Sequence, residues 1–157
     1  MEKRIYRFGH DECGADVTEG TAHDNYTLGG KGANLAEMAR IGLPVPPGFT
    51  ITCQTCMDYA RGGNAWPAGT LEAIAEARAD LEQRCGKRLG DAADPLLVSV
   101  RSGAPISMPG MMDTVLDLGL NDESVLGLAA QTGNDRFAWD SYRRFIQMFA
   151  NVVMGID

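Results

Sequence analysis

Residues 99–114 read SVRSGAPISMPGMMDT and join two apolar segments of the chain. The first segment, PLLVSV at 95–100, is short and β-branched, as expected of a buried strand, and Arg101 follows it directly. The second, DTVLDLGL at 113–120, predicts another strand with a turn at Asn121. The connection between them is rich in Gly, Pro and Met, which is typical both of a surface loop and of a lid over a site.

The rest of the chain mixes strands and helices without strict alternation. Alternating apolar residues predict strands at 3–8 and 49–52, and turn formers and acids predict an exposed loop from Gly9 to Thr27. Apolar periodicity and flanking glycines predict helices over residues 29–42, 52–61, 70–86 and 122–132, and from 136 onward. This pattern favours an α+β fold with a small mixed sheet and flanking helices.

Side-chain patterns define the expected faces and ends of these helices. Leu35, Met38 and Ala39 give the first helix an apolar face, and Thr70 is the predicted N-cap of the third. The last helix carries an apolar stripe, with Arg143 and Arg144 on the opposite side, which indicates either a solvated face or a contact with a partner. The stripe consists of Phe137, Tyr142, Phe145, Ile146, Phe149, Val152 and Val153.

Composition excludes several classes of protein. A chain of 157 residues fits a single domain, residues 1–157, with its own core. Its net charge of −7 and its lack of a basic run argue against nucleic acid or an anionic membrane surface as partners. No apolar stretch approaches the roughly 20 residues that span a bilayer, and the first residues lack the apolar core of a secretory signal. We therefore expect a cytoplasmic location and reduced cysteines.

Lys31 is the first candidate for binding an anion. Gly29, Gly30 and Gly32 surround it at a predicted helix start, where backbone can approach a phosphate closely and N–H groups are unpaired. A Walker A loop would carry Ser or Thr after the lysine, whereas this chain has glycine there. A solvated lysine at a helix start is the alternative.

Arg101 is the second candidate, because its planar guanidinium suits bidentate contact with phosphate and strand ends are common places for sites. An ion pair with one of the many carboxylates is equally consistent with its position. In the loop that follows, the methionines could line a closing lid or fill the core. Asp113 and Thr114 could bind a metal or cap the next turn.

The cysteines and histidines form no strong motif. Cys53 and Cys56 have the spacing of a redox pair or of half a zinc site, but no second pair follows. His10, Cys13 and His23 share the acidic loop and could hold an adventitious metal. Structural or incidental roles are the favoured interpretation for all of them.

Several long motifs together resemble the N-terminal part of pyruvate, phosphate dikinases. They are LGGKGANLAEM, GLPVPPGFTIT, GKRLGD, DPLLVSVRSGAPISMPGMMDTVLDLGLND and RFAWDSYRRFIQMFANVVMG, in this order between Tyr26 and Gly155. The resemblance implies the first subdomain of an ATP-grasp nucleotide-binding domain. It also implies a reaction in which ATP, phosphate and pyruvate give AMP, pyrophosphate and phosphoenolpyruvate, assisted by Mg²⁺ and a monovalent cation.

The same resemblance assigns residues to ATP. Matched residue by residue, the ATP-binding set is Lys31, Arg101, Ser102, Met108, Pro109, Gly110, Met111, Asp113 and Thr114, within a loop from Ser107 to Thr114. No catalytic residue is expected in this chain, because the family's phosphocarrier histidine lies in a Gly-Gly-x-Thr-Ser-His type motif that is absent here. No metal ligand is expected either, because the resemblance implies that the acidic metal ligands lie on the second half of the ATP-grasp domain. Neither His10 nor His23 fits that role. The acidic loop from Gly9 to Asn25 is longer than the family pattern.

We therefore expect one wall of an ATP site. The rest of the nucleotide-binding domain, the phosphohistidine domain and the pyruvate-binding barrel would lie outside this chain, which alone would be inactive. Its partners would be ATP and those remaining domains, and the full enzyme would be a homodimer. Two alternatives are a fragment of a phosphoenolpyruvate synthase, which would use water in place of phosphate, and a non-catalytic module that binds a nucleotide or a partner.

Overall fold

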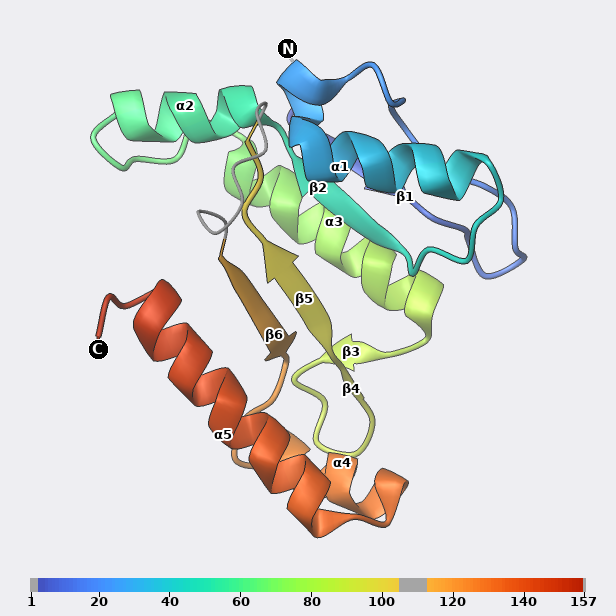
Figure 1. Cartoon of the computed structure of the whole chain (residues 1–157), viewed down its shortest axis with the longest axis vertical. Helices are drawn as coiled ribbons and strands as arrows, with labels where there is room; N and C mark the ends of the chain where they lie inside the picture. Colours follow the sequence, from blue (N-terminus) through green and yellow to red (C-terminus); the bar gives the residue numbers. More distant parts are fainter. Residues whose placement is uncertain (1–2, 105–112, 157) are drawn as a thin grey trace. The chain divides into compact units, whose positions relative to one another are not determined.

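The computed structural model describes residues 3–104 and 113–156, and these residues form two compact units (Figure 1). The first unit comprises residues 3–85 and 103–104, and the second comprises residues 86–102 and 113–156.

The first unit packs two long helices on a short sheet. Along the chain it contains β1 (Ile5–Phe8), α1 (Asn25–Arg40), β2 (Gly48–Ile51), α2 (Cys53–Arg61) and α3 (Thr70–Cys85). β1 and β2 pair antiparallel, with Ile5 opposite Ile51 and Phe8 opposite Gly48. Both α1 and α3 contact both strands. The strands at 3–8 and 49–52 are thus confirmed to within two residues.

α1 differs from the predicted helix in its start, its continuity and its buried face. It begins at Asn25, so the last residues of the predicted loop are helical, and the backbone of Gly29 breaks it with φ 71° and ψ 161°. Leu35 and Met38 are only half-buried. Ala39 is buried as predicted, and the rest of the buried face consists of Leu28, Ala33 and Ala36, because small side chains let the helix approach the sheet closely.

The starts of α2 and α3 differ in how they are capped. Thr52, the first residue of the predicted helix, is the N-cap of α2, since its side chain accepts a hydrogen bond from the N–H of Thr55. The predicted cap at Thr70 is wrong, because Thr70 is the first residue inside α3 and its hydroxyl is buried with no hydrogen-bond partner in the described part of the chain. Its N–H donates to the carbonyl of Pro67, and this loop contact fixes the helix start.

The second unit consists of four short strands and two helices. They are β3 (Arg88–Leu89), β4 (Pro95–Leu96), β5 (Val98–Arg101), β6 (Thr114–Leu118), α4 (Ser124–Thr132) and α5 (Asp135–Val152). β3 pairs parallel with β4, and β5 pairs antiparallel with β6. α5 lies along β6 and α4 (Figure 1).

The predicted buried strand at 95–100 is two strands. Leu97 separates β4 from β5, and each half pairs with a different partner. The prediction of burial holds for Pro95 and Leu96 but is wrong for β5, where Val100 is 49% exposed. Ser99 and Arg101 are exposed as well, because an isolated pair of strands leaves much of its surface to solvent.

The two helices of this unit enclose its core. Gly133 ends α4 in a left-handed conformation, and the side chain of Asn134 caps the start of α5. Both helices start within two residues of the positions that the sequence predicts. The core comprises Leu120, Val125, Leu128, Ala129 and Ala138, with Leu97, Tyr142 and Phe145 packed against it. Phe137 and Ile146, also in the predicted apolar stripe, are half exposed. Arg143 and Arg144 are exposed and both pair with Asp140.

Helices and small two-stranded sheets of both pairing types confirm the α+β class. Within the described residues, no helix has the length and apolar character needed to span a bilayer.

Candidate nucleotide-binding site

Lys31 lies immediately after the break in α1. Because Gly29 is not helical, the helical stretch that carries Lys31 begins at Gly30. The Lys31 side chain is partly exposed, and no described residue forms an ion pair or hydrogen bond with its ammonium group. Lys31 therefore lies at the start of a helical stretch, as predicted, although α1 as a whole begins at Asn25.

The backbone of Gly103 and Ala104 passes over this break. The N–H of Gly30 donates to the carbonyl oxygen of Ala104 at 3.0 Å. A Cβ atom added to Gly29 would lie 3.2 Å from the nitrogen and 3.3 Å from the oxygen of Ala104. The first residues of the loop after Arg101 are therefore held against the glycines before Lys31.

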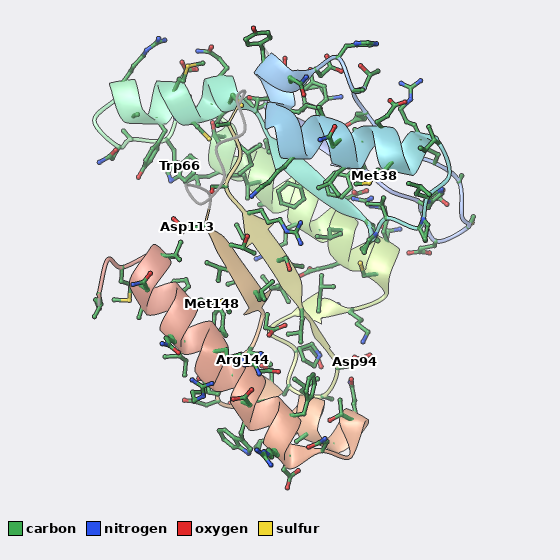
Figure 2. All side chains as sticks on the ribbon, in the orientation of Figure 1. Met38, Trp66, Asp94, Asp113, Arg144 and Met148 are labelled. Carbon is green, nitrogen blue, oxygen red and sulfur yellow. The ribbon has the colours of Figure 1, made fainter. Side chains whose placement is uncertain are left out.

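Arg101 and Ser102 lie at the end of β5, beside the beginning of β6. Arg101 is opposite Thr114 in the register, and the N–H and hydroxyl of Ser102 both donate to the carbonyl oxygen of Asp113, at 3.1 and 3.2 Å. Asp113 lies at the end of β6 that is away from α4 (Figure 2). Four of the predicted ATP-binding residues are thus neighbours, namely Arg101, Ser102, Asp113 and Thr114.

Arg101 carries a positive charge that no described carboxylate neutralises. Its side chain is exposed, and the described residues offer it neither an ion pair nor a hydrogen bond. Other arginines of the chain are neutralised, as Arg7 and Arg84 are by Asp80. The alternative that Arg101 pairs with a carboxylate has no support from residues 3–104 and 113–156.

Four of the predicted ATP-binding residues, Met108, Pro109, Gly110 and Met111, lie outside the described residues. Sequence reasoning missed Ala104, whose contact with Gly30 comes only from the fold. Gly29 was noticed only as a neighbour of Lys31, although its left-handed φ makes glycine necessary there.

The cysteines and histidines form no site in the described chain. Burial raises the pKa of the Cys53 thiol, and the neighbouring Cys56 adds to that rise, so Cys53 is a poor nucleophile at neutral pH. None of the four cysteines is in a disulfide. Among residues 3–104 and 113–156, no three His, Cys, Asp or Glu side chains gather where they could hold a metal ion.

Comparison with known proteins agrees with the motifs. Residues 25–74 match the family model described as pyruvate phosphate dikinase, AMP/ATP-binding domain. The chain is 57% identical over 155 residues to pyruvate, phosphate dikinase of Giardia intestinalis, which covers 99% of this chain and 17% of that protein. It is 55% identical over 157 residues to the Rhizobium meliloti protein of the same name, covering 100% of this chain and 17% of the relative. The chloroplastic pyruvate, phosphate dikinase 1 of Oryza sativa is 57% identical over 155 residues, covering 99% of this chain and 16% of that protein.

The match over residues 25–74 and the α+β fold of the chain indicate a class, the AMP/ATP-binding domains of the ATP-grasp type. The chain spans about one sixth of the length of the curated relatives it matches. Within the class, it corresponds to a segment of the nucleotide-binding domain of pyruvate, phosphate dikinase, as its motifs suggest.

Proposed function

We propose that the chain supplies phosphate-binding residues to the ATP site of a pyruvate, phosphate dikinase. The complete protein would convert ATP, phosphate and pyruvate to AMP, pyrophosphate and phosphoenolpyruvate. The observation that carries this proposal is identity of 55–57% to enzymes of that name over 99–100% of the chain. The remaining domains, outside this chain, would supply the phosphohistidine and the pyruvate site, and the complete enzyme would be a homodimer.

In this proposal Arg101 is the fixed cation of the site. The guanidinium of an arginine presents a planar fork of N–H donors that matches phosphate oxygens. Phosphoryl transfer depends on positioning and on positive charge around the phosphates. An exposed arginine without a carboxylate partner among the described residues is free to take that role. Ser102, Asp113 and Thr114 surround its backbone and complete the strand-end part of the site.

Lys31 would add a second positive charge. It follows the helical restart at Gly30, where the positive end of a helix dipole favours an anion. The assignment of Met108, Pro109, Gly110 and Met111 to the triphosphate rests on the resemblance alone.

Mg²⁺ and a monovalent cation belong to this proposed reaction as well. The described residues do not gather the carboxylate oxygens that Mg²⁺ prefers, so we derive no step through a metal held by them. That the metal ligands lie in other parts of the enzyme stays a prediction.

The test is an Arg101→Ala substitution in the full-length enzyme, compared with Arg136→Ala. Arg136 is a matched control because it is also exposed, in the same unit, and without an ion pair among described residues. We expect Arg101→Ala to lower kcat/KM for ATP by about 10²–10³-fold, as for other preorganised charge-stabilising groups. Its melting temperature should match that of the control.

An unchanged kcat/KM for ATP in Arg101→Ala would overturn the phosphate role. Two further measurements address the enzyme class. AMP formation that requires inorganic phosphate supports a dikinase, whereas phosphate-independent formation supports a phosphoenolpyruvate synthase. Phosphoenolpyruvate produced by the purified 157-residue chain alone would contradict the expectation that this chain is inactive by itself.

A further inference from the structure

The break in α1 is a conformation that only glycine adopts readily. Gly29 has φ 71° and ψ 161°, between two stretches of helical backbone. This region of φ and ψ costs a residue with a Cβ atom of the order of 1–3 kcal/mol, whereas glycine adopts it without that cost, so the break requires glycine at this position. The feature that surrounds Gly29 is the backbone of Gly103 and Ala104.

One backbone hydrogen bond spans two distant parts of the sequence. The N–H of Gly30 donates to the Ala104 carbonyl at 3.0 Å. Gly30 directly precedes Lys31, and Ala104 follows Arg101 by three residues. The same contact therefore holds, within the first unit, the backbone directly before Lys31.

We propose that the Gly29 break and the Gly30–Ala104 hydrogen bond form a backbone clamp within the first unit that positions the helical stretch carrying Lys31 for ATP. Gly29, Gly30 and Ala104 are then positioning residues, which act through Lys31. This inference rests on the proposed function. The clamp fixes where the helical stretch that carries Lys31 begins, and a misplaced cation loses much of its effect on the phosphates.

Gly30→Pro in the full-length enzyme removes the clamp's donor. Proline is well suited to the first helical position, and a preceding residue with ψ near 160° is compatible with it. The matched variant is Gly30→Ala, which keeps the N–H and places its Cβ 4.0 Å from the Ala104 oxygen, where there is space. We expect the KM for ATP to be about tenfold higher in Gly30→Pro than in Gly30→Ala, the size of one lost hydrogen bond.

A general loss of stability would affect all substrates alike. The KM for pyruvate should therefore agree within about twofold between the two variants, since the clamp acts on the nucleotide and not on the other substrate. Equal KM values for ATP in the two variants would overturn the clamp.

A second pair of variants tests the clamp if Gly30→Pro does not fold. Gly29→Ala places a Cβ against the backbone of Ala104, whereas Gly42→Ala, after the other end of α1, has the same sign of φ (+82°) and no atom within 4 Å. Both variants carry backbone strain, but only the first disturbs the clamp. A KM for ATP raised in Gly29→Ala alone supports the proposal, and the same KM in both contradicts it.

Arg101→Ala separates the two proposals. If Arg101→Ala raises the KM for ATP or lowers kcat/KM while the two Gly30 variants agree, the clamp is wrong and the proposed function stands. If Arg101→Ala has no effect, the phosphate role itself is wrong and the clamp, which rests on it, falls with it.

Discussion

Arg84 of α3 fastens that helix to the end of the β1–β2 sheet, and its removal should selectively destabilise the first unit. Only 5% of its side chain is exposed. Its guanidinium donates to the carbonyls of Phe8 and Gly48, at 3.0 and 3.3 Å, and those two residues are partners in the register. Its Nε lies 2.9 Å from a carboxylate oxygen of Asp80, without the alignment of a hydrogen bond.

The expected magnitude follows from these contacts. Arg84→Met keeps much of the apolar stem but deletes two hydrogen bonds from a charged donor, each worth about 1.5–3 kcal/mol. Asp80 keeps Arg7 as a partner at 3.1 Å, so no carboxylate is left isolated. We therefore expect a loss of about 3 kcal/mol in the free energy of unfolding of the first unit.

The matched control is Arg78→Met on the same helix. The Arg78 side chain is 57% exposed and lies 3.9 Å from Glu82, an arrangement worth at most about 0.5 kcal/mol. Urea unfolding can be followed by the fluorescence of Trp66 in a Trp139→Phe background, because the chain has two tryptophans and Trp139 lies in the other unit. A difference below about 1 kcal/mol between the two variants would refute the role given to Arg84.

Two predictions concern the second unit. Gly127→Ala should cost about 3 kcal/mol in a urea titration, because its Cβ would overlap the carbonyl oxygen of Ala92 and lie 2.7 Å from that of Ala93. Gly133→Ala, with φ +62° and open space around it, should cost only about 1 kcal/mol, and equal losses would contradict the packing argument. Burial raises the pKa of the Asp117 carboxyl, against the opposing effect of Arg144. A raised folded-state pKa means that ionisation destabilises the fold as pH rises above the ordinary value of 3.8, so Asp117→Asn should be more stable than the parent chain at pH 7. Asn also tolerates the φ of 59° at this position. The gain should vanish near pH 3, and a less stable Asn variant at pH 7 would show that the charge is favourable.

Local patterns predicted most of the helices. α2 and α4 begin within two residues of their expected starts, because Thr52 and the Asn121 turn provide side-chain acceptors for the first N–H groups. Gly133 ends α4 in a left-handed conformation, as its position after an apolar run suggests. These features depend on neighbours within a few residues, which a sequence displays directly.

Strand pairing was less predictable. The apolar run 95–100 gives no sign that it divides at Leu97, since no turn-forming residue interrupts it there. The division arises because β4 finds its partner in β3, upstream, while β5 finds its partner in β6, downstream. Likewise threonine is a common N-cap residue, but the N–H of Thr70 donates to the carbonyl of Pro67 and Thr70 is the first residue of α3.

For the candidate site, the sequence by itself determined the chemistry: a lysine among glycines, a strand-end arginine, and motifs long enough to identify the nucleotide-binding family. Only the tertiary structure decided the geometry. It left Arg101 without a carboxylate partner among the described residues, and it brought Ala104 onto Gly30. The physical reason is range: helix caps and strand ends depend on adjacent residues, whereas a hydrogen bond between residues 74 positions apart forms only when the whole first unit has packed.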